Sequence, residues 1–568
     1  MTPPLQKTDP PKVFAMWLAA LFLTVLGAKL WIVQLYGSPL PLWDQWYEAK
    51  GFFRAWAEGH LPWQAFFEPD NGHRILANRV LDVTLIELNG RWEPLMQMTA
   101  NVCIHATFAG GLAFCLWHFL GRKNGGLFCV LVAPFYALPY AGENAIWAIT
   151  LEYFLDAFSL ATLVLLGFAR PGSRWWWAGV AVAVLGLFTM ATGLLAPMTV
   201  AGLTVLRLIK EWRLKKNKWN LITLGVCAGI TVLGASLNSV TEDKSLQAHA
   251  LKEFLPAFFR NLTWVFYDSP VAGFFVLLLP LLLLLIVYFR RNFAESRAAE
   301  LLLTMGLWGI LQAAALGYGR ANYGDGYPTS RYLDILNIAV IAALFAVLLL
   351  ARFWLRGPFF TRFTLLAPVI FSAVIFCALA RISETVVDGL LQPTRTMNLV
   401  AEERVERFLS TGNQSELFEK PTVRPEPKVA LEVLTNASLQ VILPACCLPP
   451  ATPQVAGRFS FVSNWLLNNA TTLLYGGLVL FLALVGRQLV RSPAGLAWEN
   501  LPAFIALLAL LAALGFVWSR SVNTRRTMEY SLQTQLVGYF QANNNPQRAA
   551  IHAAKAEALK NDAGRLRP

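Results

Sequence analysis

Stretches of apolar residues alternate with polar connections along the whole chain of 568 residues. Most of these stretches are close to the roughly 20 residues that an α-helix needs to cross a bilayer. The pattern predicts an all-α polytopic membrane protein with about 13 transmembrane helices. Their expected cores are residues 14–35, 98–119, 125–141, 146–168, 175–192, 194–209, 219–238, 270–289, 299–317, 335–352, 363–381, 472–487 and 500–518.

The first apolar run, residues 13–35, predicts a retained membrane anchor. It is too long for the apolar core of a signal peptide, and no small-residue cleavage site follows it. The composition agrees with a membrane protein, because 56% of the residues are hydrophobic and only 14% are charged. A soluble domain contains about 25% charged residues.

Basic residues gather in alternate loops, which predicts the orientation of the chain. Short cytoplasmic loops carry an excess of lysine and arginine, so we expect these loops and the N-terminus to be cytoplasmic. The net charge of +13 follows from the same loops. They lack the interleaved aromatic residues of RNA-binding modules, so nucleic acid is not an expected partner. The basic loops lie at residues 7–12, 122–123, 170–174, 207–218, 290–297, 352–362 and 487–491.

The opposite face is expected to carry the longer polar segments. In loop 37–97, the mixture of aromatic and charged residues over 46–56 predicts an interfacial helix with its rings at headgroup depth. A second such helix is expected over residues 75–88. The proline-containing stretch after the eleventh span is long enough for a small periplasmic module, for which we expect an α/β fold. The predicted units are a core of residues 1–382, the module 383–470, two last transmembrane helices in 471–519 and a C-terminal tail, 520–568.

Asp44 is the first candidate for chemistry. It follows the first apolar run and lies between Trp43 and Trp46. Apolar neighbours raise the pKa of a carboxylate and a nearby arginine lowers it. In either case a carboxylate at this place could take a proton from an acceptor hydroxyl. The alternative is a structural aspartate that caps the helix after it.

Basic residues on the same expected face are candidates for binding an anion. An arginine presents a planar, permanently charged fork that matches phosphate oxygens, and His73 beside Arg74 could donate a hydrogen bond to the same group. The alternative is that Arg74 extends to lipid headgroups.

A second basic segment contains Arg320 and Arg331, which flank a glycine-rich loop. Glycines allow backbone N–H groups to approach a phosphate closely, so this segment could hold a phosphate or diphosphate leaving group. Tyr332 and the other tyrosines nearby, Tyr318, Tyr323 and Tyr327, offer faces on which a sugar ring could stack. The alternative is an aromatic belt with membrane-facing arginines, in which Asp325 and Asp334 pair with the arginines.

A third polar group, Glu143, Asn144 and Trp147, opens the fourth span, and Glu152 follows inside it. A carboxylate at that depth is costly and is usually functional or paired. Asp156 lies four residues later on the same helix face, and the alternative is a buried salt bridge to another helix. No histidine and cysteine cluster has zinc spacing and no Asp-X-Asp pair is present, so no metal site is predicted.

The order of these motifs resembles a family of large bacterial inner-membrane proteins that are similar to GT-C type glycosyltransferases. The likeness covers most of residues 13–470. The motifs are Trp43-Asp44-Gln45-Trp46, Asn71-Gly72-His73-Arg74-Ile75, Glu143-Asn144 with Trp147, Met190-Ala191-Thr192-Gly193 with Leu194 and Leu195, Tyr318-Gly319-Arg320, Ser330-Arg331-Tyr332, residues 408–413 and residues 439–444.

The resemblance implies a GT-C-like fold and a transfer reaction at the periplasmic face of the inner membrane. The donor would be a sugar on polyprenyl phosphate, and the acceptor a glycan or lipid of the cell envelope. An acidic residue near the end of the first span acts as base, a place that Asp44 matches. Membrane lipids would be further partners, and no cofactor is implied beyond the donor itself. The residues expected to hold the substrate are His73, Arg74, Glu143, Asn144, Trp147, Glu152, Arg320, Arg331 and Tyr332.

Two questions stay open at this point. The chain lacks the clear acidic pair that better-known members carry after the first span, so the base is Asp44, Glu48 or Asp70, and metal dependence is undecided. The alternative function is a transporter or flippase for an envelope lipid or glycan precursor, which would need buried charges along a path through the bilayer.

Overall fold

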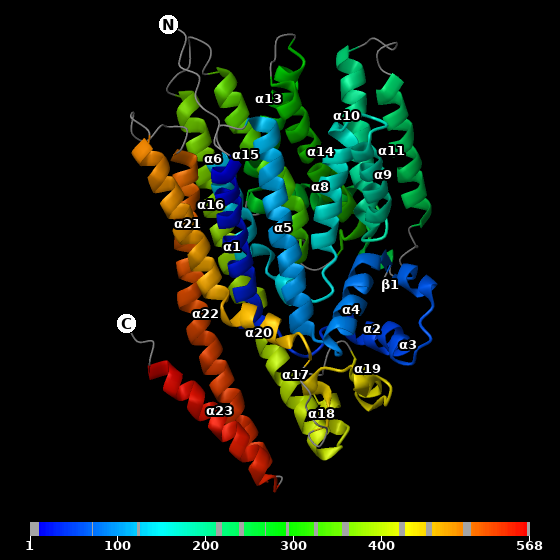
Figure 1. The fold of residues 1–568 in the computed structure, drawn as a ribbon, viewed down its shortest axis with the longest axis vertical. Helices are drawn as coiled ribbons and strands as arrows, with labels where there is room; N and C mark the ends of the chain where they lie inside the picture. The colour runs from blue at the N-terminus through cyan, green and yellow to red at the C-terminus, as the bar shows by residue number, and fades with distance from the viewer. Residues whose placement is uncertain are drawn as a thin grey trace.

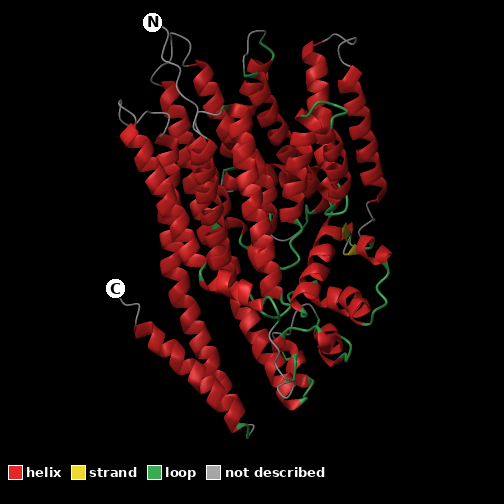
Figure 2. Ribbon diagram, in the orientation of Figure 1, coloured by secondary structure: helices red, strands yellow, loops and turns green. Residues whose placement is uncertain are grey.

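The computed structural model describes residues 11–70, 72–121, 125–211, 218–237, 244–266, 269–290, 295–322, 328–354, 363–419, 426–449, 457–491, 501–542 and 544–564. Nearly all of these residues are helical, and the helices form a tall bundle whose long axes run in the same general direction (Figures 1 and 2). The bundle has an upper end, where α1 begins, and a lower end, which carries α2–α4 and α17–α19 (Figure 1).

Within the described residues, nine helical segments are long and apolar enough to cross a membrane. The fold is therefore that of an all-α, multi-pass membrane protein. These segments are Pro11–Tyr36, Pro94–Leu120, Ala191–Lys210, Lys218–Leu237, Pro270–Tyr288, Ser296–Gly319, Ser330–Trp354, Leu366–Thr411 and Ala470–Gln488.

The long helices of the bundle are α1 (Pro11–Tyr36), α5 (Pro94–Leu120), α6 (Gly125–Ala137), α8 (Glu152–Phe168), α9 (Arg174–Gly186), α10 (Leu195–Glu211), α11 (Lys218–Leu237), α13 (Pro270–Tyr288), α14 (Ser296–Gly319), α15 (Leu333–Trp354), α16 (Phe363–Val386), α21 (Ala470–Arg491) and α22 (Leu501–Ala542). The other α-helices are α2 (Gln45–Glu48), α3 (Arg54–Ala57), α4 (Leu76–Asn89), α7 (Glu143–Ile146), α12 (Leu251–Leu262), α17 (Gln392–Thr411), α18 (Ser415–Phe418), α19 (Pro427–Thr435), α20 (Ser460–Asn468) and α23 (Pro546–Gly564).

Short 3₁₀ segments are η2 (Trp63–Phe67), η3 (Pro139–Ala141), η4 (Ala191–Leu194), η6 (Lys244–Leu246), η7 (Trp264–Phe266), η8 (Ser330–Tyr332), η10 (Leu439–Val441) and η11 (Ala445–Cys447). Two segments are π-helical, η1 (Ala49–Phe53) and η9 (Val387–Leu391). A two-stranded antiparallel sheet pairs β1 (Pro69–Asp70) with β2 (His73–Arg74).

Each of the 13 predicted cores coincides with a helix, but four of them are not among the nine candidate spans. Three of the four helices are short: α6 and α9 have 13 residues each and α8 has 17. At 1.5 Å per residue such helices reach roughly 20–25 Å, less than a hydrocarbon core of about 30 Å. The fourth, α22, includes many side chains that lie outside the described set.

The first helix, α1, packs along α5, α6 and α21. Two glycines let α1 and α21 approach closely. A Cβ atom on Gly27 would lie 2.2 Å from the backbone nitrogen of Leu474, and one on Gly477 would lie 2.5 Å from that of Thr24. Small residues at helix crossings provide van der Waals contact where lipid gives no hydrophobic drive for association. Substitution of either glycine by a larger residue would therefore force α1 and α21 apart.

A second core at the lower end corrects two expectations about the polar segments. Trp46, Phe52 and Phe53 do not lie at headgroup depth, because they are buried against residues of the 383–470 stretch such as Phe408 and Val433. The two predicted helices of loop 37–97 do form, as the run α2–η1–α3 and as α4. The described residues of the module are helical rather than α/β. The aromatic pattern of residues 46–56 therefore reflects packing against the module.

The helix α16 continues through η9 into α17 without a break, across the boundary predicted at residue 382. The C-terminal tail forms a helical hairpin of α22 and α23, and α22 packs on α17 at the lower end (Figure 1). His552 on α23 and Glu406 on α17 join these elements, with 3.0 Å between the ring Nε2 and the carboxylate. The tail therefore shares the lower end with loop 37–97 and the module.

Basic residues of different loops meet at the upper end, as the alternation predicts. Arg207 on α10 pairs with Glu300 on α14 at 2.8 Å. Arg352 at the end of α15 donates a hydrogen bond to the carbonyl of Leu120 at the end of α5. Lys7, Arg122 and Lys123 lie outside the described residues.

Candidate functional site

Asp44 lies at the start of α2, eight residues after the last residue of α1, Tyr36. Its side chain makes no capping hydrogen bond to α2, so the structural role considered for it is not the one it has. The preceding residue, Trp43, has a φ of 55°, a left-handed conformation that is costly for a bulky side chain. Such strain is found at functional sites more often than elsewhere, because packing must hold it in place.

Arg331 lies in η8, and its surroundings come from the segment between α6 and α8. Its backbone N–H donates to the Glu143 carboxylate at 3.2 Å, and its carbonyl accepts from the Asn144 amide at 2.8 Å. The guanidinium lies over the Trp147 ring, 4.9 Å from its centroid, and over that of Tyr332 at 5.1 Å. Four residues predicted to hold the substrate thus surround Arg331, although they are nearly 190 positions away or adjacent to it in sequence.

The Arg331 charge connects this group to Asp44. Burial raises the pKa of Asp44 and the Arg331 guanidinium lowers it, with burial the larger effect. The pKa of Glu143 is raised for the same reason, with Arg331 again the opposing charge. The Arg331 charge also acts on Glu152, the first residue of α8. Asp44 and Arg331 therefore belong to one site at the lower end.

His73 joins the site from the small sheet. The Ala191 backbone N–H donates to its Nδ1 at 3.5 Å, which makes Nε2 the protonated nitrogen of the neutral ring. Burial lowers the pKa of His73 to about 4, and the charges of Arg320 and Arg331 act in the same direction. A neutral imidazole with a free Nε2–H is a hydrogen-bond donor to an anion. Gly193 in the same segment has no room for a Cβ, which would lie 2.0 Å from the carbonyl of Gly186.

Asp70 is the second carboxyl group of the site. It lies opposite His73 in the β1–β2 pair, and Gly72 between them adopts a φ of 82° that glycine tolerates. Burial, with the charges of Glu48 and Asp44, raises the pKa of Asp70 to about 7, and the Arg79 charge acts in the opposite direction. The site thus contains a pair of acids, Asp44 and Asp70, separated by 26 positions in sequence. The sequence alone showed no clear acidic pair after the first span, because these two residues are far apart in the chain.

Two candidate residues have structural roles instead. Arg74 donates to the carbonyls of Phe67 and Leu237, so its guanidinium holds backbone rather than a ligand. Glu48 forms a two-point ion pair with Arg79, at 2.7 and 3.1 Å. These bonds occupy both carboxylate oxygens, and Glu48 is therefore not available as a base. The sequence could not exclude either residue because the partners are distant along the chain.

Other candidates lie outside the described residues: Asn71, Tyr323, Gly324, Asp325, Gly326 and Tyr327. Arg320 caps the end of α14, where its N–H bonds the carbonyl of Leu316, and its charge acts on His73. Asp334 does not pair with an arginine as expected. Its carboxylate accepts a hydrogen bond from Asn144 at 2.9 Å and faces Lys29 at 3.9 Å.

Lys29 and His105 are polar residues that the sequence reasoning missed. Both are fully buried, and both lie 3.9 Å from Asp334. An averaged hydropathy profile hides one lysine in a run as apolar as residues 13–35. The available signal was the lysine itself, because an ionisable residue inside a span marks function or pairing.

In the part of the chain that the structure describes, no group of three or more His, Cys, Asp or Glu residues is arranged to hold a metal ion. Comparisons with protein-family models, with curated proteins and with solved structures give no match to this chain.

Proposed function

We propose that this protein is a membrane glycosyltransferase that moves a sugar from a polyprenyl-phosphate donor to a glycan or lipid acceptor of the cell envelope. The observation that carries the proposal is the convergence of Asp44 with Arg331 at the lower end of the bundle. A carboxyl group under the influence of Arg331, together with a neutral histidine near Arg320 and Arg331, matches the needs of sugar transfer from a phosphate. In this proposal the lower end faces the periplasm of a bacterial inner membrane.

The proposed reaction is a single displacement with inversion at the anomeric carbon. The acceptor hydroxyl oxygen forms a bond to that carbon while its proton passes to the Asp44 carboxylate. The bond between the anomeric carbon and the phosphate oxygen breaks, and its electron pair leaves with the polyprenyl phosphate. Arg331 and Arg320 neutralise the phosphate, and His73 donates a hydrogen bond to it. A general base is worth roughly 10²–10⁴-fold, and electrostatic stabilisation of the leaving group as much.

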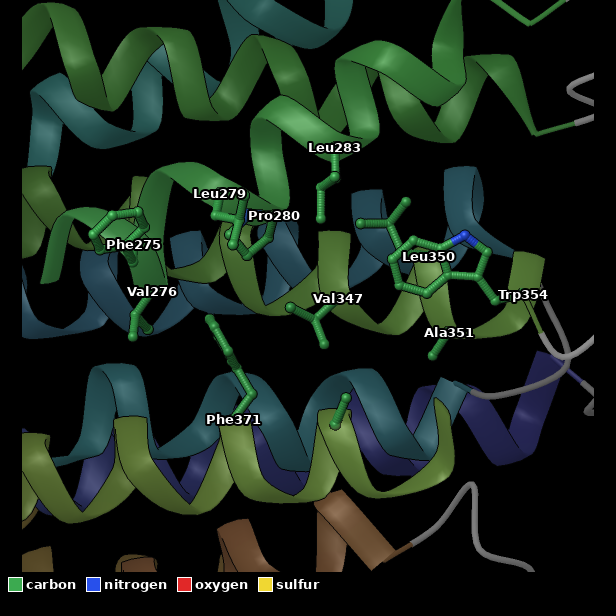
Figure 3. Close-up of a pocket in the computed structure, with 11 residues that line it drawn as sticks. Phe275, Val276, Leu279, Pro280, Leu283, Val347, Leu350, Ala351, Trp354 and Phe371 are labelled. Atoms are coloured by element: carbon green, nitrogen blue, oxygen red, sulfur yellow. The ribbon is translucent and has the colours of Figure 1, made fainter. Parts of the chain in front are cut away.

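An apolar cavity of about 670 Å³ between α13, α15 and α16 supports a lipid-linked substrate. Figure 3 shows Phe275 and Leu279 of α13 on one side of it and Phe371 of α16 on the other, with Val347 of α15 between them. All of its lining residues are hydrophobic, as a prenyl chain requires. At the lower end of α13, Trp264 of η7 lies 5.3 Å from the Tyr140 ring. The Tyr140 carbonyl accepts the Ser330 hydroxyl at the site, whereas the cavity's residues on α15, from Val347 to Trp354, lie towards the upper end of that helix.

A transporter or flippase is the second candidate, and one observation favours it. Lys29, His105, Asp156 and Asp334 are buried together inside the bundle, and charged residues at such depth line the pathways of many transporters. This function would require the path to continue from these residues to the upper end.

The test uses purified protein in liposomes with radiolabelled polyprenyl-phosphate sugars and envelope extract as acceptor. We expect Asp44→Asn and Arg331→Ala each to reduce transfer of label by about 100-fold or more, because one removes the base and the other the phosphate partner. The matched control is Glu87→Gln, an exposed acid on α4 that should leave transfer within about twofold of wild type. Wild-type transfer by both folded site variants would reject the proposal. Label crossing the bilayer without transfer would support the transporter.

A further inference from the structure

Four helices bring ionisable side chains together inside the bundle, away from the site proposed above. Lys29 comes from α1, His105 from α5, Asp156 from α8 and Asp334 from α15, and each is at most 2% exposed. Asp334 is the centre of the group, with Lys29 Nζ and His105 Nε2 each 3.9 Å from one of its oxygens. By the rise of 1.5 Å per residue, Lys29 lies roughly 10 Å above the lower end of α1. We call these four residues the buried cluster.

Polar atoms of the buried cluster lack hydrogen-bond partners among the described residues. They include Lys29 Nζ, both ring nitrogens of His105 and both carboxylate oxygens of Asp156. The hydroxyls of Tyr136 and Tyr153 also lack hydrogen-bond partners among the described residues. Native proteins bond the great majority of buried polar groups, so a concentration of unbonded ones at one place marks a functional site. The Tyr153 ring stacks on His105 at 3.9 Å and fixes its plane.

The charges of the region do not balance if every acid is ionised. Three carboxyl groups, Glu152, Asp156 and Asp334, act on one another, and the one lysine acts on Asp334 and Asp156. Isolated charges in a medium of low dielectric constant are costly, so at least one carboxyl group in such a set keeps a proton. The titratable and charged groups that face the set are Lys29, His105, Tyr136, Tyr140, Glu143, Glu152, Tyr153, Arg331 and Asp334.

We propose that the buried cluster is a proton-binding site in the membrane interior, with Asp156 as the group that gains and loses the proton. Asp334 is paired with Lys29 and bonded to Asn144, which leaves Asp156 as the carboxyl group without a bonded partner in the described chain. The proton comes from water at the lower end and returns there. Glu152, four residues before Asp156 on α8, is the intermediate carrier. The inference is independent of whether the chain transfers sugars.

One amide links the buried cluster to the lower-end site. The Asn144 side chain donates both to the Asp334 carboxylate, at 2.9 Å, and to the Arg331 carbonyl, at 2.8 Å. A hydrogen bond to an ionised acceptor is stronger than one to a neutral acceptor. Charge changes next to Asp334 therefore alter the bond that holds the Arg331 backbone. The Arg331 charge also acts directly on Glu152, so its removal should make protons bind more tightly to the carboxyl groups of this region.

The experiment is infrared difference spectroscopy of the full-length protein in lipid nanodiscs during a pH titration, in H₂O and D₂O. We expect the wild type to show a protonated-carboxyl C=O band that titrates reversibly and shifts in D₂O. Asp156→Asn should abolish this band. Arg331→Gln should move its titration midpoint by about one pH unit, a tenfold change in proton affinity. The matched control is Glu300→Gln, which removes a buried but fully bonded carboxylate and should leave the band unchanged.

Three results would overturn the proposal. The band could persist in Asp156→Asn, it could stay constant over the whole pH range, or its midpoint could follow the sodium concentration at fixed pH, which would assign the site to a metal cation. If Asp156→Asn does not fold, Lys29→Met replaces it. Loss of the lysine charge should then increase the protonated-carboxyl signal, and an unchanged signal would reject the proposal.

Discussion

Two ionic groups inside the same bundle are built in opposite ways. Near the upper end, Arg207 and Glu300 form a complete unit: the arginine donates twice to the carboxylate and once to the carbonyl of Gly167, and the Tyr288 hydroxyl donates to the second carboxylate oxygen. In the buried cluster nearer the lower end, Lys29 and Asp334 are 3.9 Å apart, and the Asp156 carboxylate has no hydrogen-bond partner among the described residues.

This difference separates a structural ion pair from a reactive one. Desolvation of two charges is offset only when the geometry is good and the remaining polar atoms are bonded, which the upper pair achieves. The charged groups of the buried cluster are desolvated but lack compensating hydrogen bonds, and binding of a proton by a carboxylate reduces the net charge. The completeness of bonding, more than burial, therefore distinguishes the two.

The largest effect is expected from breaking the complete pair. Arg207→Ala should lower the free energy of unfolding by about 3 kcal/mol, because it leaves the Glu300 carboxylate buried without its cation. Thermal unfolding in detergent, followed by intrinsic fluorescence, measures the loss. The double variant Arg207→Met with Glu300→Met should recover most of it. A single variant as stable as wild type would show that the pair is not what holds α10 to α14.

An intermediate effect is expected where the same contrast recurs outside the membrane, between Glu48, which is paired with Arg79, and Asp70, which forms no ion pair with the residues that the structure describes. The pKa of Asp70 is raised from 3.8 to about 7, so its protonated form favours the folded state. That stabilisation is complete below about pH 4 and is lost as the pH rises through about 7. Asp70→Asn should remove this dependence, and the two proteins should diverge by on the order of 1 kcal/mol by neutral pH. Parallel pH curves of unfolding temperature would contradict it.

The smallest effect is expected in the buried cluster. Asp156→Asn should change the free energy of unfolding by less than about 1 kcal/mol, because it removes a carboxyl group that has no bonded partner to lose. Glu300→Gln, which weakens a bonded pair, should cost more under the same conditions. If Asp156→Asn were the more damaging of the two, the distinction between complete and incomplete bonding would fail.

Much of the fold was predictable from the sequence because hydrophobic length is a local signal. Every predicted core became a helix, and a long helix needs no information from distant parts of the chain. The burial of Trp46 and Phe53 was not predictable, because an aromatic ring facing lipid headgroups and one facing another segment have the same sequence pattern. Only the contact with residues near Val405 decides between them.

The candidate site was predictable in its types of residue and only partly in its members. Asp44, Arg331 and Glu143 stood out as charges at the ends of apolar runs, and the fold brings them together. Arg74 had the same sequence signal as Arg331, yet its guanidinium donates hydrogen bonds to two backbone carbonyls. Lys29 was hidden by its apolar neighbours. Partners decide the role of a charged side chain, and the partners are set by tertiary structure.

The uninterrupted helical path from α16 through η9 into α17 has a mechanical consequence. A continuous helix that runs from the transmembrane bundle into the module should transmit a tilt of its transmembrane part to the module. The part beyond η9 is roughly 30 Å long, so a small tilt of α16 becomes a displacement of several ångströms at its tip. Leu391, at the end of η9, touches the position of Gly142 beside Glu143. We therefore expect a tilt of α16 at Leu391 to reach the backbone next to Glu143.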